Sequence, residues 1–399
     1  MKSTLWKMAG RVPVQCAKAL AQGLLLLVVA TCVSACAMLG PLTTGYHGLN
    51  IEEVHRTIIV AHPAGSNRIY PYIRHVADDR ILVDGGTHTV SRRPQMISHD
   101  GGFTWNRFNS PDDVFVKYAR SVRFTNDIYY HHSFFHASRL LVDCKRDCSG
   151  AWSEGGEVLD RISNIEIAVP NQIRPEYRPI MIIQNAIFSP DSHLLLFAHT
   201  HFEEDPPDET RRYRNHRRTI VLRSVDRGQT FEYLSTIATH RDSPWGVEGP
   251  NEPSGIFLQS GELFAVMRTG SDPRHRRRAF DMLSARSFDN GKTWEDHRRI
   301  PREGVWPQVI QLTNGVLVCT AGRPFNHLIF SVDNGRTWTT KYTLDRRHRS
   351  SGYIDIREIE PNRILVVYEA DGFRERRFWL WEPPPEKNVA KAVILDVVR

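Results

Sequence analysis

Four copies of one eight-residue pattern constrain the fold of this chain more than any other feature. Each copy follows the frame S-x-D-x-G-x-T-[W/F], in which Asp and Gly stand two residues apart. Glycine can adopt the positive φ of a tight turn, and aspartate can accept hydrogen bonds from nearby backbone N–H groups. The flanking residues suit strands, so each copy predicts a β-hairpin whose aromatic side chain is buried between layers. The copies are SHDGGFTW (98–105), SVDRGQTF (224–231), SFDNGKTW (287–294) and SVDNGRTW (331–338).

A second, fainter repeat consists of a short polar turn followed by an apolar run. Short apolar runs bounded by turns are typical of buried strands. Repeated strand units in a chain of 399 residues predict a single all-β domain built from similar blades. The runs are 79–83, 192–197, 261–266, 315–318 and 362–367.

The eight-residue frame resembles the Asp-box (BNR) repeat of the sialidase superfamily, whose members are six-bladed β-propellers. The resemblance implies an all-β, six-bladed, sialidase-like propeller over residues 51–399, with blades near 66–108, 115–158, 178–236, 247–298, 304–341 and 350–382. The last strand, 392–397, is predicted to pair with the N-terminal strand and close the ring, because closure removes exposed sheet edges. In that superfamily the boxes lie at the blade periphery, so they predict the fold rather than the activity.

Residues 1–36 have the pattern of a secretory signal peptide, with basic residues before the apolar run 23–30 and small residues after it. The run is too short for a comfortable membrane span. The tetrapeptide VSAC that ends at Cys36 resembles the bacterial lipobox. That resemblance implies cleavage before Cys36, lipidation of its sulfur and an outer-membrane lipoprotein, with residues 37–50 as a tether. The alternative is ordinary secretion with an incidental cysteine.

Charge and cysteine content limit the partners. The net charge is +7, but four basic residues and no acidic ones lie in residues 1–36, which leaves +3 for the remainder. We therefore expect no nucleic-acid partner. Cys144 and Cys148 are predicted to form a disulfide in an oxidising compartment, and Cys319 is predicted to be buried. No second Cys or His pair has metal-site spacing, so neither a metal nor a cofactor is predicted.

The register of the second repeat brings candidate site residues together. Counting back nine residues from the turns gives Tyr70, Glu252, Trp306 and Tyr353. Counting forward seven or eight residues gives Arg268, Arg323 and Glu369. Equivalent positions on equivalent strands face the same way, so these side chains should approach one another near the propeller axis.

The same residues resemble the sialidase active site. The segments 251–255 and 266–270 resemble those that carry the catalytic Glu and a carboxylate-binding Arg, which implies these roles for Glu252 and Arg268. Gly322-Arg-Pro324 resembles the segment of another such Arg, here Arg323, and 351–355 that of the tyrosine nucleophile, here Tyr353. A phenol suits this role because a carboxylate nucleophile would be repelled by the carboxylate of sialic acid. Guanidinium groups can pair with that carboxylate in a bidentate way.

Two departures from the family pattern occur near the first blade. The family's first Arg lies in an R-I-P tripeptide, whereas this chain reads Arg68-Ile-Tyr-Pro71, and a slip of one residue turns a strand side chain to the other face. Arg74 is the substitute for Arg68. Asp84 is the candidate acid/base, and His88 is its alternative because the pKa of histidine is near neutrality.

Three functions follow as hypotheses. The first is a surface-anchored exo-glycosidase that removes terminal sialic acid, or a related acidic sugar, from glycans or glycoconjugates. The second is a carbohydrate-active enzyme of other specificity on the same fold, such as one that cleaves uronic acids. The third is a non-catalytic propeller that binds glycan or protein. Glu252 and Tyr353 favour the first, and the departures favour the other two.

Overall fold

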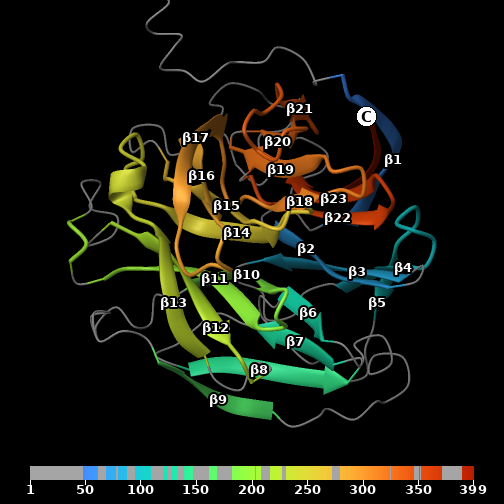
Figure 1. Cartoon of the computed structure of the whole chain (residues 1–399). Coiled ribbons are helices and arrows are strands. Elements are labelled where there is room, and N and C mark those ends of the chain that lie inside the picture. Colours follow the sequence, from blue (N-terminus) through green and yellow to red (C-terminus); the bar gives the residue numbers. More distant parts are fainter. Residues whose placement is uncertain are drawn as a thin grey trace, which may run out of the picture. The chain divides into compact units, whose positions relative to one another are not determined.

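The computed structural model describes most of the chain after residue 47 (Figure 1). The described residues are 48–61, 69–77, 80–87, 95–108, 120–124, 128–132, 139–146, 161–168, 182–202, 204–207, 216–226, 231–271, 279–323, 325–345, 350, 352–370 and 389–399. They contain 24 β-strands and one short 3₁₀ turn, His240–Asp242. The all-β prediction is therefore confirmed.

The strands form four-stranded antiparallel units in chain order. The first unit contains β2 (Ile69–Ala77), β3 (Arg80–Thr87), β4 (Gln95–Ser98) and β5 (Asn106–Phe108). The second contains β6 (Arg120–Phe124), β7 (Ile128–His132), β8 (Arg139–Arg146) and β9 (Arg161–Ala168). The third contains β10 (Ile182–Phe188), β11 (Leu194–Thr200), β12 (Arg218–Ser224) and β13 (Phe231–Ala238). A short parallel pairing of β13 with β9 joins the second and third units.

The remaining strands complete three further units. The fourth contains β14 (Asn251–Phe257), β15 (Leu263–Arg268), β16 (Asp281–Ser287) and β17 (Glu295–Glu303). The fifth contains β18 (Val309–Gln311), β19 (Leu317–Gly322), β20 (Asn326–Ser331) and β21 (Tyr342–Thr343). The sixth contains β22 (Ile354–Glu360), β23 (Arg363–Ala370), β24 (Val389–Val398) and, from the other end of the chain, β1 (Asn50–Ala61).

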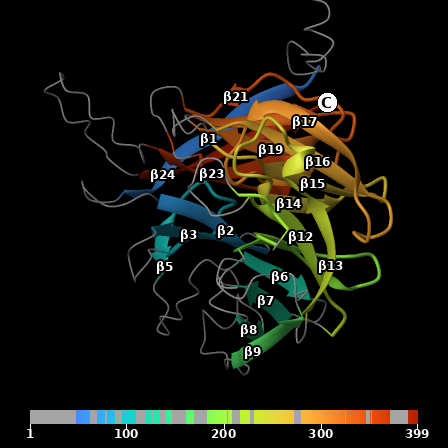
Figure 2. The ribbon, with the colours of Figure 1, turned by 90° about the vertical axis from the view of Figure 1, so that its left-hand side faces the viewer.

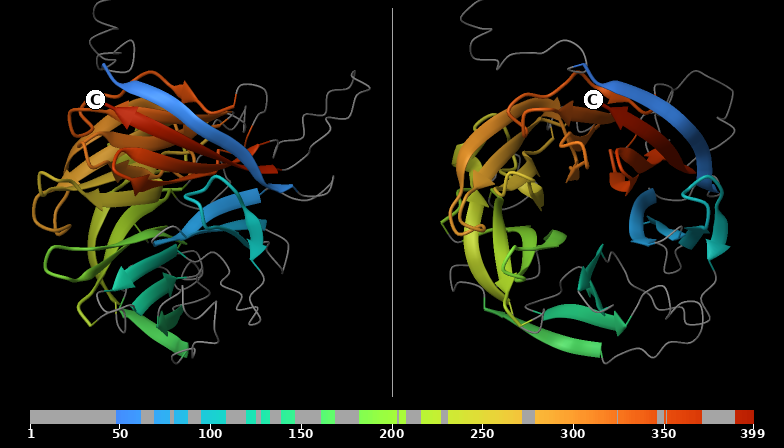
Figure 3. Two further views of the ribbon diagram at one scale, coloured as in Figure 1. Left: turned by 90° about the vertical axis from the view of Figure 1, so that its right-hand side faces the viewer. Right: turned by 45° about the vertical axis from the view of Figure 1, so that its right-hand side comes forward.

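The six units are the blades of a closed propeller. The first strand of each unit contacts the first strand of the next, in the order β2, β6, β10, β14, β18 and β22, and β22 contacts β2 again. Figure 3 shows the same succession of sheets. The predicted six-bladed architecture is thus confirmed, and the first strands form its inner layer.

The ring is closed by the two ends of the propeller. β1 runs antiparallel to β24, with Ile51 opposite Val397 and Ala61 opposite Val389 (Figure 2). The predicted pairing of the last strand with the N-terminal strand is confirmed. It covers the edge of β24, which would otherwise present unpaired backbone groups.

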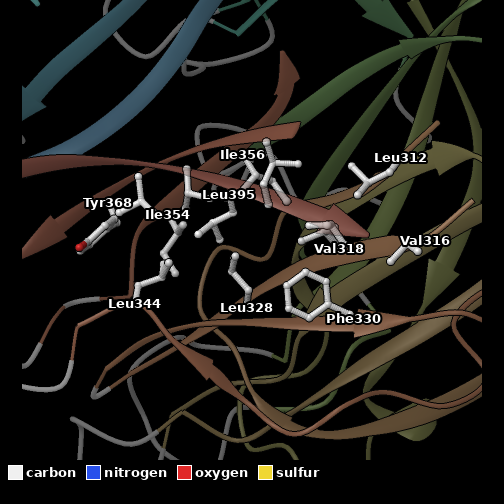
Figure 4. Packing of buried hydrophobic residues seen from close by; sticks show 14 of the residues in the cluster. Leu312, Val316, Val318, Leu328, Phe330, Leu344, Ile354, Ile356, Tyr368 and Leu395 are labelled. Atoms are coloured by element: carbon white, nitrogen blue, oxygen red, sulfur yellow. The ribbon is translucent and has the colours of Figure 1, made fainter. Parts of the chain in front are cut away.

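The apolar core lies between neighbouring blades. One cluster joins the fifth and sixth blades, and Figure 4 shows Val318, Leu328 and Phe330 facing Ile354 and Leu395. Similar clusters join the third blade to the fourth, the fourth to the fifth and the sixth to the first. A strand buried on both faces needs a continuous apolar run, which is why β11 reads LLLFA and is buried throughout.

The Asp boxes form the connections between the third and fourth strands of four blades. In the fifth blade the Oγ of Ser331 donates to Asp333 Oδ1 at 2.7 Å and accepts from the N–H of Gly335 at 2.8 Å. Thr337 donates to Asp333 from its N–H at 2.9 Å and from its Oγ1 at 2.6 Å. The first and fourth blades repeat these bonds.

The predicted burial of the box aromatics is only partly correct. Phe231 and Trp338 are buried, with 2% and 5% of their surface exposed. Trp105 and Trp294 are half-buried and pack against the rims of core clusters. The connection to the fourth strand lies at the edge of the blade, so the neighbouring blade covers some of these rings incompletely.

Candidate functional site

Five of the residues predicted from the repeat register lie on, or close to the ends of, the first two strands of the fourth, fifth and sixth blades. Glu252 is in β14, and Arg268 ends β15. Trp306 precedes β18, Arg323 directly follows β19, and Tyr353 directly precedes β22. The closed ring of inner strands brings these three blades together.

Glu252 is held by hydrogen bonds to both of its carboxylate oxygens. Arg268 Nη1 donates to Oε1 at 2.8 Å, and the backbone N–H of Trp306 donates to Oε2 at 2.7 Å. The exposed fractions of Glu252 and Arg268 are 6% and 4%. This pairing satisfies the rule that a buried charge needs a partner of opposite charge.

Arg268 contacts a second carboxylate as well. Its Nη2 lies 3.3 Å from Glu248 Oε1 and donates to Ser271 Oγ at 2.9 Å. Arg323 Nη1 lies within 3.4 Å of the same Ser271 oxygen. The two arginines therefore meet at one serine hydroxyl, and two carboxylates stand beside Arg268.

Aromatic rings from three blades pack next to this polar cluster. The ring centroid of Trp306 lies 5.9 Å from that of Tyr353 and 6.3 Å from that of Tyr72. Tyr72 and Trp306 are buried with Val305, and Tyr353 is half-buried at the edge of the group. Trp306 thus contacts Glu252 through its backbone and Tyr353 through its ring.

The backbone is strained at three of the predicted site residues. Glu252, Trp306 and Arg323 have φ values of 50°, 50° and 81°. Among the described residues, five other non-glycine residues have positive φ, and four of these are Asn or Asp, which tolerate this region. Such strain costs of the order of 1–3 kcal/mol per residue and clusters at functional sites.

A close approach of two blades places Arg323 beside Tyr353. Gly352 has φ +88°, and a Cβ there would lie 3.2 Å from the backbone nitrogen of Arg323. A Cβ on Gly322 would lie 3.0 Å from the Cα of Gly352. The absence of side chains at both glycines allows the segments that carry the guanidinium and the phenol to touch.

Glu369 also joins the neighbourhood of Tyr353. It is fully buried in β23, and its backbone N–H donates to the carbonyl of Tyr353 at 3.4 Å. The repeat register grouped Glu369 with Arg268 and Arg323, and it occupies the corresponding end of the second strand of its own blade.

The other predicted site residues are placed only by their backbone or not at all. Tyr70 lies in β2, opposite Gly86, and Asp84 lies in β3, opposite Tyr72, while their side chains are outside the described part. Arg68 and His88, together with Cys36 and Cys148, lie outside the described residues. Cys144 lies in β8 without a described side chain, so the disulfide stays a prediction.

Cys319 is a free, fully buried cysteine of β19, as predicted. Burial raises the pKa of its thiol. Among the described residues, no group of three or more His, Cys, Asp or Glu side chains has the arrangement of a metal site. Within the same residues, no helix has the length and apolar character that a membrane crossing requires.

Several residues of the site were missed in the sequence. Tyr72 stands two positions after Tyr70 in the sequence, and the period of two in strands could have identified it. Glu248 and Ser271 lie in irregular segments at the ends of strands, where the repeat carries no register. His199 and Arg217 reach the backbones of Glu252 and Glu248 from the third blade. His199 stands seven residues after the turn at Ser192, the count that gives Arg268 and Glu369 in their blades, so the repeat register could have identified it.

Comparison with known proteins gives a likeness of fold. No protein-family model and no curated protein matches the sequence. A solved structure of unknown function from Dyadobacter fermentans DSM 18053 is similar at a TM-score of 0.55 and 15% identity, over 88% of this chain and 99% of that one. The Hadza microbial sialidase Hz136 is similar at 0.52 and 14%, over 83% of this chain and 65% of that one.

A third similar structure is an alpha-L-arabinanase of Penicillium chrysogenum complexed with arabinobiose. Its TM-score is 0.56 at 12% identity, over 86% of this chain and 98% of that one. Identities this low show the fold alone. The chain thus has the propeller fold that is found in sialidases and in arabinose-active glycosidases.

Proposed function

We propose that this protein is an exo-glycosidase of the sialidase type, which hydrolyses a terminal sialic acid or a related acidic sugar from glycans. In this proposal Tyr353 is the nucleophile, Glu252 accepts its proton, and Arg268 and Arg323 bind the substrate carboxylate. The single observation that carries the proposal is the polar cluster around Glu252, in which Arg268 and Trp306 bind both carboxylate oxygens.

The chemistry proceeds in two displacements. Glu252 takes the phenolic proton as the Tyr353 oxygen attacks the anomeric carbon, and the bond to the leaving glycan oxygen breaks while an acid protonates that oxygen. Water then gives a proton to the group that acted as the acid and attacks the same carbon, which releases Tyr353, and Tyr353 recovers its proton from Glu252. This sequence retains the anomeric configuration, because each displacement inverts it once. Asp84 is the proposed acid/base, with His88 as the alternative.

Positioning of Glu252 supports this role. A base must stand within hydrogen-bond reach of the proton that it abstracts, and a misplacement of about 1 Å can cost about 10²-fold in rate. The bonds from Arg268 and from the Trp306 N–H fix both oxygens of Glu252. Trp306 also packs against the Tyr353 ring, so one residue contacts both proposed partners.

A neutral substrate is the second candidate, and one observation favours it. Glu248 and Glu252 both stand beside Arg268, so two negative charges already offset its positive charge. An arginine in this state attracts a substrate carboxylate less strongly than a lone guanidinium does. Two of the similar structures are arabinose-active enzymes bound to arabinobiose, so a neutral pentoside such as an α-L-arabinofuranoside is the alternative substrate class.

A panel of fluorogenic glycosides tests the proposal. The protein starting after Cys36 should be assayed on an α-sialoside, on uronides and on an α-L-arabinofuranoside, each at several pH values. We expect the highest kcat/KM on the sialoside or on a uronide. Highest activity on the arabinofuranoside would replace the acidic substrate by the neutral one. Cleavage of none of them, with binding of a glycan measured by calorimetry, would favour the non-catalytic binding propeller.

A further inference from the structure

A histidine on the neighbouring blade binds the backbone of Glu252. The backbone N–H of Glu252 donates to Nδ1 of His199 at 3.1 Å, across from β14 to β11. His199 is buried, with 1% of its surface exposed. Glu252 has φ 50°, a value in the left-handed region that residues with a side chain disfavour. The hydrogen bond to His199 is therefore made by a strained part of the backbone.

This hydrogen bond requires that Nδ1 of His199 carries no proton. A protonated imidazole donates from both nitrogens and has no lone pair for the Glu252 N–H. Burial, followed by the nearby charge of Arg217, holds the pKa of His199 well below its usual range. Both causes favour the neutral ring, which can keep an acceptor at Nδ1 facing the Glu252 N–H.

His199 belongs to a closed circuit of buried polar residues. With Nδ1 as the acceptor, Nε2 carries the hydrogen and faces Arg217 Nη1 at 3.0 Å; both groups are donors, so this contact is proximity and not a hydrogen bond. The backbone N–H of Arg217 donates to the carbonyl of Glu248 at 2.8 Å. Glu248 pairs with Arg268, and Arg268 pairs with Glu252, which completes the circuit. All five residues have exposed fractions between 1% and 6%.

The backbone is packed tightly where this circuit crosses between blades. A Cβ on Gly249, which has φ +74°, would lie 2.2 Å from the carbonyl oxygen of Arg217. The segment that leads into β14 therefore lies directly against the residue that precedes β12, and no side chain could be inserted between them. The circuit links the third blade to the fourth through backbone contact as well as through side chains.

We propose that His199 is a positioning residue for Glu252. It holds the Glu252 backbone in its strained conformation, so that the carboxylate reaches both Arg268 Nη1 and the Trp306 N–H. An apolar side chain would fill the same space between blades without polar atoms to satisfy, so the buried imidazole at this position needs a reason, and the Glu252 N–H supplies it. The catalytic consequence of this positioning rests on the function proposed above.

Three variants test the role. His199→Leu keeps an apolar filling but removes the acceptor, whereas His199→Asn keeps an acceptor oxygen near the position of Nδ1. His327→Leu is the matched control, because His327 is another buried histidine, on β20, and its Nδ1 lies 3.2 Å from Thr343 Oγ1. The thermal unfolding temperature of each of the three variants shows how much the substitution lowers the stability of the whole protein.

Hydrogen–deuterium exchange at the Glu252 amide decides the proposal without any substrate. We expect exchange at this amide to rise about tenfold or more in His199→Leu, and to stay near the wild-type rate in His199→Asn and His327→Leu. The Gly255 amide of the same strand, which donates to Asn185 Oδ1 at 3.1 Å, serves as the internal reference and should not change. Unchanged exchange at Glu252 in His199→Leu, or an equal rise at Gly255, would overturn the proposal.

Kinetics on the substrate found in the glycoside panel test the consequence for catalysis. We expect kcat to fall about 10²-fold in His199→Leu with KM changed little, and to recover in His199→Asn. A normal kcat in His199→Leu would overturn the catalytic part even if exchange rises. If the wild type cleaves no glycoside, the proposed function fails, and the exchange result still supports or overturns the positioning of Glu252.

Discussion

Single residues of the site carry more than one contact each, so substitutions there have separable effects. Arg268 pairs with Glu252 and with Glu248, and Arg323 Nη1 lies 3.4 Å from Ser271 Oγ. Both arginines are nevertheless proposed to bind the same substrate carboxylate. Replacement by lysine keeps the charge but removes the planar pair of donors, so it separates structural pairing from substrate binding.

Arg268→Lys should lower the free energy of unfolding by about 1–3 kcal/mol, because one ammonium group cannot serve two buried carboxylates in the geometry of the guanidinium. Arg323→Lys should raise KM for an acidic glycoside about tenfold. Denaturant unfolding of Arg268→Lys and steady-state kinetics of Arg323→Lys measure the two effects. Unchanged stability in Arg268→Lys, or an unchanged KM in Arg323→Lys, would contradict these roles.

Residues with a repeat position were predictable, and residues without one were not. Glu252, Trp306 and Tyr353 each stand nine residues before a turn of the second repeat. Residues at the same distance from such a turn occupy equivalent positions on equivalent strands. Glu248 has no such position, because it lies in an irregular segment. His199 stands seven residues after the turn at Ser192, but its bond to a backbone N–H of the next blade has no signal in the register. Contacts between blades depend on how the blades pack, and a repeat within the sequence does not encode that.

Asp boxes are the elements that connect the outer strands, and their aspartates should link stability to pH. Burial alone would raise the pKa of Asp333, but the hydrogen bonds from Thr337 and Ser331 outweigh it and lower the pKa. The equivalent hydrogen bonds from Thr104 and Ser98 outweigh burial at Asp100 and lower its pKa to about 2. A carboxylate whose pKa is lower in the folded state adds stability above its unfolded pKa of about 3.9 and loses it as the pH falls.

We expect the free energy of unfolding to fall as the pH drops from about 5 to about 2, since the boxes lose this contribution across that window. Asp333→Asn should be less stable than the wild type at neutral pH and should show a shallower fall at acidic pH. Urea unfolding at several pH values is the measurement. A variant with the wild-type slope between these pH values would show that Asp333 does not contribute.

Box aromatics differ in burial, so their removal should differ in cost. Trp338→Ala should destabilise the protein by about 3–5 kcal/mol, because the ring is 5% exposed and packs in the core between the fourth and fifth blades. Trp294→Ala should cost less, since that ring is half-buried. Both variants should keep glycosidase activity below their unfolding temperatures. An activity loss without a loss of stability would contradict a structural role for the boxes.

At the scale of elements, the four boxes and the five apolar runs predicted most of the blade pattern. Each box lies between the third and fourth strands of a blade, and each apolar run became a second strand, such as β15 or β19. The sequence of the second blade carries weaker box and strand signals, and its parallel pairing with β13 of the third blade was not predicted. A pairing between neighbouring units depends on their contact and leaves no periodic pattern in either.

The whole molecule is proposed to be held at the outer membrane by lipid on Cys36, which lies outside the described residues. Cys36→Ser should release the protein into the soluble fraction, because a serine cannot receive the thioether-linked lipid. Cys32→Ser is the matched control, since Cys32 lies in the same leader but does not end the VSAC tetrapeptide. Membrane association of the Cys36→Ser variant, or release of the Cys32→Ser variant, would contradict the proposed anchor.

The proposed glycosidase activity of the whole molecule depends on one group, the phenol of Tyr353. Tyr353→Phe deletes the attacking oxygen but keeps the ring that packs against Trp306, so the fold should stay intact. Tyr342→Phe, on β21 and away from the site, controls for loss of a tyrosine hydroxyl. The decisive measurement is kcat of both variants on the glycoside that the wild type cleaves best. We expect kcat to fall at least about 10²-fold in Tyr353→Phe and not to fall in Tyr342→Phe, whereas wild-type turnover in Tyr353→Phe would contradict the tyrosine mechanism.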